Sequence, residues 1–390
     1  MRRRVLLLLL VTAMTSVAVA QPAPWTVGVI VSRTGPATAT GTLQAHTAER
    51  FAETLGRSGV FGTPIHVDVR DDAGDPVRAA ALATELADAG VSAVVCCTTP
   101  AATGRVATAL ETAGVPLLAI TDLDPAGTTW TFVVAPSDRT RLTAIAVDAA
   151  GEGKVSLALM TLATPFGDAA VDAFERALAD AGRSVAGEAR YPADAPVLTP
   201  EALWIATRQP GAVVVWGLPL DLPRAVDALR RRGYEGLVYA RPEALPTAVL
   251  TRVRTAGAPL RGDDLWTGVR APFAPAALAG RLPVDHPNHD AVASFVGRAL
   301  AGDPNAASAA DRSVLALVDD ALVWLLAAQE QVAALGLDDG IATRRQALRD
   351  TLISLPPTLL AAGTYDATDG DRRAARWQGL VLAELGPPIP

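Results

Sequence analysis

Three residues that follow a buried apolar run have the pattern of an anion site. Thr98, Thr99 and Pro100 come just after the run Ala93–Cys96, where a strand would end and a helix would begin. In parallel α/β sheets, ligands bind beyond the carboxyl ends of the strands. Two hydroxyls and the N–H groups of a helix start could hold a carboxylate there. A plain helix-capping role explains Thr99 equally well, so both interpretations stay open.

Catalytic and metal-binding signatures are absent from the sequence. No Gly-x-Ser-x-Gly turn, Walker loop or His-Glu-x-x-His motif occurs. His286 and His289 lie in a segment, Asp-His-Pro-Asn-His-Asp, that resembles a metal loop, but no third cluster of ligands accompanies them. We interpret this segment as a polar surface turn. The sequence predicts no enzyme, no metal site and no cofactor.

The first twenty residues have the composition of a secretory signal peptide. Arg2–Arg4 form a basic start, an apolar run begins at Val5, and Ala18-Val19-Ala20 precedes Gln21 as a small-residue cleavage site. The segment is too short for a stable membrane anchor, although a retained anchor is the alternative. No cysteine follows the site to carry a lipid. We therefore predict an exported, periplasmic or otherwise extracytoplasmic, soluble product.

Charge and composition exclude several classes of protein. The 390-residue chain has a formal net charge of −7, and loss of the three signal-peptide arginines lowers it to −10. Nucleic-acid binding needs a positively charged surface, so we predict no nucleic-acid partner. Half of the residues are hydrophobic and 19% are charged, which excludes a disordered chain. The length predicts two domains or one two-lobed body.

The only two cysteines, Cys96 and Cys97, are neighbours in the sequence. Two adjacent cysteines cannot form a disulfide framework, so the stability must come from the hydrophobic cores. A strained vicinal disulfide and a pair of free thiols are both compatible with the sequence.

Short apolar runs alternate with helical patterns along most of the chain. The runs are continuous rather than alternating, which is typical of strands buried on both faces of a parallel sheet. Asp75-Pro76 and Thr99-Pro100 indicate helix starts, and Gly90 and Gly114 indicate the corresponding ends. The alternation predicts an α/β fold with parallel sheets. The predicted strands are Val27–Val31, Ile65–Val69, Ala93–Cys96, Pro116–Thr121, Phe132–Ala135, Val155–Met160, Ala212–Trp216, Leu237–Ala240 and Leu265–Val269.

One long apolar segment, Val314–Ala328, has the composition of a membrane span at first sight. Asp319 and Asp320 lie in its middle, and Gln329-Glu330 follows it. Carboxylates are costly in the bilayer core, so the segment predicts a buried helix instead.

Six motifs follow one another along the chain. They are Val27-Gly-Val-Ile-Val-Ser-Arg-Thr-Gly-Pro36, Asp71-Asp-Ala-Gly-Asp-Pro76, Gly114-Val-Pro-Leu-Leu118, Pro165-Phe166-Gly167, Arg241-Pro242-Glu243-Ala244 and Gly363-Thr-Tyr-Asp-Ala-Thr-Asp-Gly370. In this order they resemble the branched-chain amino-acid binding proteins, which are type I periplasmic substrate-binding proteins of ABC transporters. The resemblance covers essentially the whole mature chain, and its second motif is the most specific.

The resemblance implies two Rossmann-like lobes, with parallel central sheets flanked by helices, joined by three hinge crossovers. We place the crossovers near Ala135–Arg139, Val269–Pro272 and Gly363–Asp366. After a signal peptide at 1–20, the first lobe then comprises residues 25–136 plus 271–363. The second lobe comprises residues 137–270 plus 364–390, and the ligand would bind between the two.

Positions in the first lobe acquire binding roles from the resemblance. The hydroxyl turn that holds the ligand carboxylate in the family would correspond to Thr98 and Thr99. Pro100 is included because it lies between alternative alignments of this turn with the family. Thr121 and Asp122, after the next strand, would add a backbone and a hydroxyl contact.

In the second lobe, the resemblance implies that Phe166 packs on the ligand and that Glu243 accepts its ammonium. A desolvated ammonium needs a charged partner, although a solvated loop acid is the alternative for Glu243. The family often has tyrosines where this chain has Thr40 and, after Trp216, Leu218. Phe166, Trp216 and Leu218 would form an apolar wall if they face the ligand.

The resemblance therefore predicts a monomeric solute-binding protein of an ABC transporter, which would capture a small, aliphatic or otherwise apolar, amino acid and deliver it to a membrane permease. A ligand-sensing clamshell receptor for an amide or a small carboxylate is the alternative. A secreted hydrolase is disfavoured, because no nucleophile turn is present.

Overall fold

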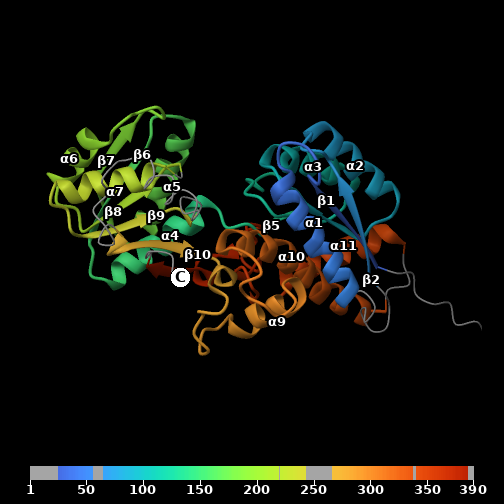
Figure 1. Ribbon diagram of the computed structural model, residues 1–390. Coiled ribbons are helices and arrows are strands. Elements are labelled where there is room, and N and C mark those ends of the chain that lie inside the picture. The colour runs from blue at the N-terminus through green and yellow to red at the C-terminus, as the bar shows by residue number, and fades with distance from the viewer. Residues whose placement is uncertain (1–24, 56–64, 219, 243–265, 337–339, 385–390) are drawn as a thin grey trace, which may run out of the picture.

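The computed structural model describes residues 25–55, 65–218, 220–242, 266–336 and 340–384. They form two lobes, each built on its own β-sheet with helices packed against both faces (Figure 1). The predicted α/β class with two Rossmann-like lobes is confirmed.

The first lobe is built on five parallel strands in the order β2-β1-β3-β4-β5. Phe51 and Trp324 pack on one face of this sheet, and Leu86 and Leu110 pack on the other. The strands are β1 Trp25–Val31, β2 Ile65–Asp71, β3 Ala93–Cys96, β4 Leu117–Ala119 and β5 Thr131–Val133, and the helices of this lobe are α1 Thr38–Thr54, α2 Pro76–Asp88, α3 Pro100–Ala113, α9 His289–Ala299, α10 Ala309–Ala334 and α11 Ile341–Ser354.

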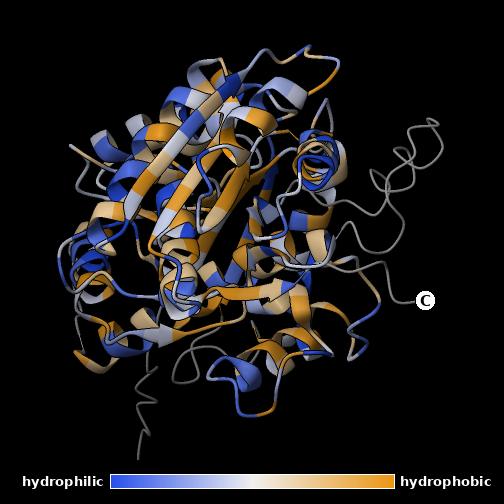
Figure 2. Ribbon diagram, turned by 90° about the vertical axis from the view of Figure 1, so that its left-hand side faces the viewer, coloured by the Kyte–Doolittle hydropathy of each residue, from blue (hydrophilic) through white to orange (hydrophobic). Residues whose placement is uncertain are grey.

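The second lobe has six strands in the order β14-β10-β9-β8-β6-β7, of which only β14 runs antiparallel to its neighbour. Hydrophobic residues dominate its central strands, whereas hydrophilic residues occur on the helices around them (Figure 2). The strands are β6 Ser156–Leu162, β7 Ser184–Tyr191, β8 Ala212–Trp216, β9 Leu237–Ala240, β10 Val269–Phe273 and β14 Val381–Glu384, and the helices are α4 Asp138–Gly151, α5 Pro165–Asp180, α6 Thr199–Ala206 and α7 Asp221–Arg231.

Helix ends lie where the predicted capping residues place them. The Asp75 carboxylate accepts the Val77 N–H at 2.8 Å, and Pro76 is the first residue of α2. Gly114 ends α3 with a φ of +63°, a left-handed conformation that glycine adopts at low cost. These local signals orient the turns between strands and helices, on which the candidate site depends.

The long apolar segment forms the middle of α10, and its two acids are buried within the protein. Asp319 receives two hydrogen bonds from Arg298, at 3.1 and 2.6 Å. Asp320 accepts the N–H groups of Ala361 and Ala362 at 2.9 and 2.6 Å and the Tyr365 hydroxyl at 3.0 Å. Among the described helices, none has the length and apolarity to cross a membrane.

Three segments connect the two lobes. The first runs from β5 to α4, and the second runs from β10 into the short helix η3, Pro275–Leu278. The third follows a small sheet of β11 Thr358–Leu359, β12 Thr364–Tyr365 and β13 Ala375–Arg376.

The third segment bears on where the lobes divide. Tyr365 packs in the core of the first lobe, and β14 pairs with β10 in the second. We therefore propose that this crossover lies at residues 377–380 rather than near Gly363–Asp366. The other lobe boundaries stay predictions.

Several strand predictions differ from the structure. The strand expected at Pro116–Thr121 is the shorter β4, the one expected at Phe132–Ala135 ends at Val133 in β5, and β14 and the small sheet were not predicted. The strand expected at Leu265–Val269 begins only at Val269, because the residues from Trp266 form a turn. β7, Ser184–Tyr191, was not predicted, since it is an edge strand whose outer part is exposed and lacks a continuous apolar run.

Candidate functional site

The turn between β3 and α3 has the geometry of a capped helix start. Thr99 is the N-cap residue, and its Oγ1 accepts the Ala102 N–H at 3.3 Å. Pro100 is the exposed first residue of α3. The first turn of a helix carries N–H groups that no carbonyl within the helix can accept. Both interpretations of Thr99 are thus compatible, since a cap and an anion site share this backbone.

Thr98 is held by residues from two other segments. Its hydroxyl donates to Gln44 Oε1 at 2.7 Å and accepts the Ser32 N–H at 2.9 Å. Ser32 in turn donates to the buried Asp72, at 2.7 Å from its Oδ1. Because a hydroxyl has one proton, Thr98 has none left to donate to a carboxylate. The Thr98 side chain therefore positions the turn rather than providing a donor.

Thr121, after β4, lies next to this turn. Its Oγ1 is 2.6 Å from Thr103 Oγ1, and Thr103 donates to the Thr99 carbonyl at 3.0 Å. Since Thr103 uses its single proton there, Thr121 is the donor of the pair, and its oxygen can accept from a ligand. Thr40 lies separately, half-buried in the first turn of α1 beside Gly41, which packs on the Ser32 backbone.

The predicted apolar wall of the second lobe is incomplete. Phe166 is half-buried at the start of α5, as a contact residue should be. Trp216 is fully buried, and its indole N–H donates to Asp138 Oδ2 at 3.0 Å. Leu218 is 46% exposed. Glu243 lies outside the described residues.

Arg241, at the end of β9, was not assigned a binding role from the sequence. Its Cζ lies 5.0 Å from the Phe166 ring centroid and 5.6 Å from that of Trp216. Its Nη2 is 3.9 Å from Asp138 Oδ1. A cation therefore lies where the sequence predicted an apolar surface. Arg241 belongs to the motif Arg241-Pro242-Glu243-Ala244, in which the resemblance implied a role only for Glu243.

Asp138 is the first residue of α4, which follows the segment that connects β5 of the first lobe to the second lobe. It contacts Trp216, Arg141 and Arg241 of the second lobe. Its charge also acts on Asp122, after β4 of the first lobe.

The Asp122 side chain is exposed to solvent, but neighbouring protein atoms exclude water from part of its surroundings. This desolvation raises the pKa of Asp122, and the negative charge of Asp138 also raises it. The positive charges of Arg373 and Arg141 act to lower it. We call Thr99, Thr121, Asp122, Asp138, Phe166 and Arg241 the strand-end cluster.

The cysteines and histidines are not part of this cluster. The Cys96 and Cys97 sulfurs are in direct contact, and both side chains are buried. The His286 Nδ1 accepts the Asn288 N–H at 3.1 Å within its own turn. Across the described ranges, no group of three or more His, Cys, Asp or Glu residues could hold a metal ion.

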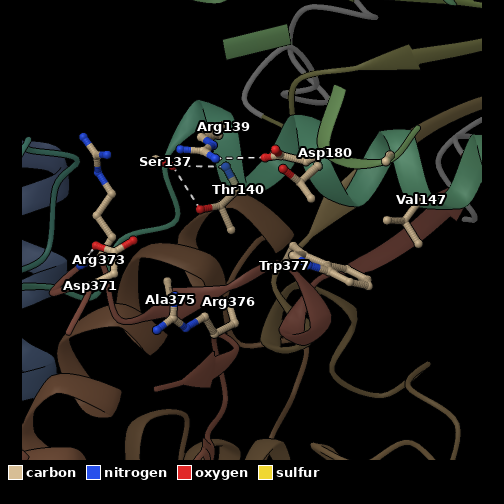
Figure 3. A pocket seen from close by; sticks show the side chains of 12 residues that line it. Ser137, Arg139, Thr140, Val147, Asp180, Asp371, Arg373, Ala375, Arg376 and Trp377 are labelled. Atoms are coloured by element: carbon tan, nitrogen blue, oxygen red, sulfur yellow. Dashed lines mark hydrogen bonds and ion pairs between the residues drawn. The ribbon is translucent and has the colours of Figure 1, made fainter. Parts of the chain in front are cut away.

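A separate pocket of about 340 Å³ lies between α4, the end of α5 and the segment before η4, Trp377–Gly379 (Figure 3). It contains none of the predicted site residues. Its charged groups already form ion pairs, Arg139 with Asp180 at 2.8 Å and Arg376 with Asp369 at 2.6 Å. We propose that the ligand binds instead at the strand-end cluster, to which both lobes contribute polar groups.

The profile of the periplasmic binding protein family matches residues 24–376. The chain belongs to this family. It is a binding protein of type I architecture rather than an enzyme, and the family acts outside the cytoplasm. No curated protein sequence gives a match.

Several solved structures share the fold of this periplasmic binding protein. An extracellular ligand-binding receptor from Rhodopseudomonas palustris HaA2 has a TM-score of 0.66 and 21% identity, over 93% of this chain and 98% of that one. LivJ of Streptococcus pneumoniae, a branched-chain amino acid transporter protein in complex with isoleucine, has a TM-score of 0.59 and 15% identity, over 93% and 100%. A type 1 periplasmic binding protein from Bordetella pertussis has a TM-score of 0.63 and 17% identity, over 93% and 96%. Such identities establish the fold, so the ligand must be inferred from this chain's own residues.

Proposed function

We propose that this protein is the solute-binding component of an ABC transporter, which captures an amino acid between its lobes and delivers it to a membrane permease. The observation that carries the proposal is the strand-end cluster, in which polar groups follow the strands of both lobes and the charge of Asp138 acts on Asp122. We further propose that residues 1–20 are a cleaved signal peptide and that the mature protein works as a monomer.

The first lobe supplies complementary groups for both charges of an amino acid. The N–H groups at the start of α3 attract a carboxylate. The Thr121 oxygen accepts hydrogen bonds, and the nearby Asp122 carboxylate can attract an ammonium. Glu243 remains our proposed main partner of the ammonium, because its position in the motif corresponds to the acid of the family. This polarity supports a zwitterion over a simple carboxylate or amide.

The positions of Trp216 and Leu218 argue against a preference for ligands with an aliphatic side chain. This preference depended on a wall formed by Phe166, Trp216 and Leu218, and Trp216 is fully buried behind Phe166 and Arg241. Phe166 remains as the packing surface. We therefore propose the amino-acid class without a preference for an aliphatic side chain.

A thermal-shift screen of amino acids, amides and small carboxylates tests the proposal. A ligand that binds only the folded state raises the melting temperature by mass action, so at least one amino acid should do so. For that amino acid, we expect Glu243→Ala to reduce affinity about 30-fold or more, because a buried ammonium loses its counter-charge. Glu235→Ala, at an exposed acid of the same lobe, is the matched control and should have no effect.

The outcomes are distinct. An amino acid that binds Glu243→Ala as tightly as the wild type would contradict the assignment of Glu243. Stabilisation by amides or simple carboxylates alone, with no response to any amino acid, would contradict the amino-acid proposal and favour the sensing alternative.

A further inference from the structure

The edge of the second sheet that lies opposite the strand-end cluster differs in charge from the protein as a whole. Strands β6, β7, β8 and β9 are parallel, so the segments that lead into them, 152–155, 181–183, 207–211 and 232–236, meet at this edge. We call these four segments the strand-start edge. The chain has a formal net charge of −7. The charged residues of the strand-start edge are instead four cations and two acids, namely Lys154, Arg183, Arg208, Arg232, Glu152 and Glu235.

Two of these cations line a pocket of about 490 Å³ at the strand-start edge. The stem of Lys154 lies over Gly211, where an added Cβ would be 3.2 Å from the Lys154 Cβ. The Lys154 ammonium and the Arg232 guanidinium form no ion pair or hydrogen bond with the residues that the structure describes. Among the described lining residues, Glu235 is the one acid. Both cations are therefore available to an anion that enters the pocket.

Cations at this edge could instead serve the helices, because α4, α6 and α7 end there and cations are favoured at helix C-termini. Arg230 has this role, since its Nη1 donates to the Tyr234 and Gly236 carbonyls at 2.7 and 3.0 Å. Lys154 and Arg232 donate to no carbonyl within the described ranges. Helix capping thus accounts for Arg230 and leaves the two pocket cations without a partner there.

Exposed apolar side chains lie among the cations of the strand-start edge. Val155 is 64% exposed, and its carbonyl accepts the N–H of the residue before Val185, which is 43% exposed. Trp204 is 38% exposed and packs on Gly187 of β7. The guanidinium of Arg208 stacks on this indole, with its Cζ 3.2 Å from the ring centroid. A tryptophan and aliphatic side chains beside cations are typical of surfaces that bind at the membrane–water interface.

We propose that the strand-start edge binds the surface of an anionic phospholipid membrane. A headgroup phosphate would bind in the pocket between Lys154 and Arg232, which can both form charge-assisted hydrogen bonds with it. Val155, Val185 and Trp204 would contact the boundary between headgroups and acyl chains. These apolar residues favour a lipid surface over a soluble phosphate, which would leave them in water.

The place of this edge in the fold agrees with the proposal. The family acts outside the cytoplasm, where the outer face of the inner membrane is accessible. The strand-start edge and the strand-end cluster lie at opposite ends of the same strands. Membrane binding therefore leaves the strand-end cluster accessible to its own ligand.

Co-sedimentation with lipid vesicles tests this inference. The vesicles consist of phosphatidylcholine with or without phosphatidylglycerol, and all proteins start at Gln21, so that the apolar N-terminal segment does not contribute. The proteins are the wild type, the double variant Lys154→Gln/Arg232→Gln and the control variant Arg78→Gln/Arg105→Gln. The control removes two exposed arginines of α2 and α3, which form no ion pair within the described part of the first lobe. Unfolding curves would verify that each variant is folded.

We expect the wild type to bind vesicles with phosphatidylglycerol at least about tenfold more tightly than vesicles of phosphatidylcholine alone, because each nearby cation is attracted to the anionic surface. High salt should weaken this binding by screening. The double variant Lys154→Gln/Arg232→Gln should bind about tenfold or more weakly than the wild type. The control variant, which has the same net charge, should differ from the wild type less than about threefold.

Three results would overturn the inference. The first is vesicle binding that does not depend on phosphatidylglycerol, and the second is equal binding by the double variant and the control variant. The third comes from calorimetry with glycerol phosphate. Binding of this soluble headgroup by the wild type but not by the double variant, without any binding to vesicles, would show that the pocket holds a soluble phosphate instead. The proposed amino-acid function would be unaffected in each case, because the variants leave the strand-end cluster unchanged.

Discussion

The Thr98 hydroxyl joins three segments of the first lobe. It donates to Gln44 of α1 and accepts from the backbone of Ser32, after β1, while Thr98 itself follows β3. Replacing it by valine would leave an acceptor and a donor without their partner in a partly buried place. Because the place is only partly buried, water can replace part of each loss, and the two together should cost about 1–3 kcal/mol.

We therefore expect Thr98→Val to lower the free energy of unfolding by about 1–3 kcal/mol. Urea denaturation measures this value. Thr108→Val is the matched control, because its hydroxyl bonds only to the Gly104 carbonyl on the exposed side of α3, and it should change stability by less than about 0.5 kcal/mol. Equal stability of Thr98→Val and wild type would show that the network does not position this turn.

At the same scale, the sequence predicted which residue types lie at the strand ends. It did not predict which hydrogen-bond partners their hydroxyl groups have. Thr98 was predicted as a donor, yet its proton goes to Gln44, which is 54 residues away in the chain. The position of Arg241 was not predicted, because it depends on rings that β6 and β8 bring beside it. Such partners are set by tertiary packing, which a local motif does not contain.

At the scale of elements, α10 is a buried helix that carries an acid in an apolar setting. Burial, and to a smaller extent the charge of neighbouring Asp319, raises the pKa of Asp320 to about 8, although the three donors around Asp320 act to lower it. The folded protein therefore keeps a proton at neutral pH that the unfolded chain, with an ordinary aspartate pKa near 4, releases. Stability from this group is complete below pH 4 and is lost as the pH rises toward 8.

We predict that the free energy of unfolding includes a contribution from Asp320 that falls by about 1.4 kcal/mol per pH unit between pH 5 and 7. Urea denaturation at several pH values would measure it. In Asp320→Asn this part of the slope should vanish, and the variant should be less stable than the wild type near pH 5, because an amide has one oxygen fewer to accept from the three donors. Identical slopes in the two proteins would contradict the prediction.

Elements with a strong local pattern were predicted well, and those defined by their neighbours were not. α3 was predicted from Thr99-Pro100 to Gly114, and β8 and β9 have the predicted bounds. β10 starts four residues later than expected and includes Pro272, because its place depends on pairing with β9 and with the distant β14. Pairing between segments more than 100 residues apart leaves no periodic signal in either one.

At the scale of the whole molecule, two separately folded cores are joined by three connecting segments. Tyr365, between two of these connections, is tied to α10 through Asp320, whereas β14 is tied to the second sheet. The lobes therefore have rigid interiors and few covalent links, an arrangement that permits hinge closure. The polar groups of the strand-end cluster are divided between the lobes, so a ligand that contacts both favours a closed state.

The central claim is that a small amino acid binds between the lobes and bridges them. Small-angle X-ray scattering of the protein with and without a saturating amino acid, its binding verified by calorimetry, tests this claim most directly. We predict a smaller radius of gyration in the bound state, since closure brings the two cores together. A radius of gyration that stays the same while the ligand is bound would contradict the account.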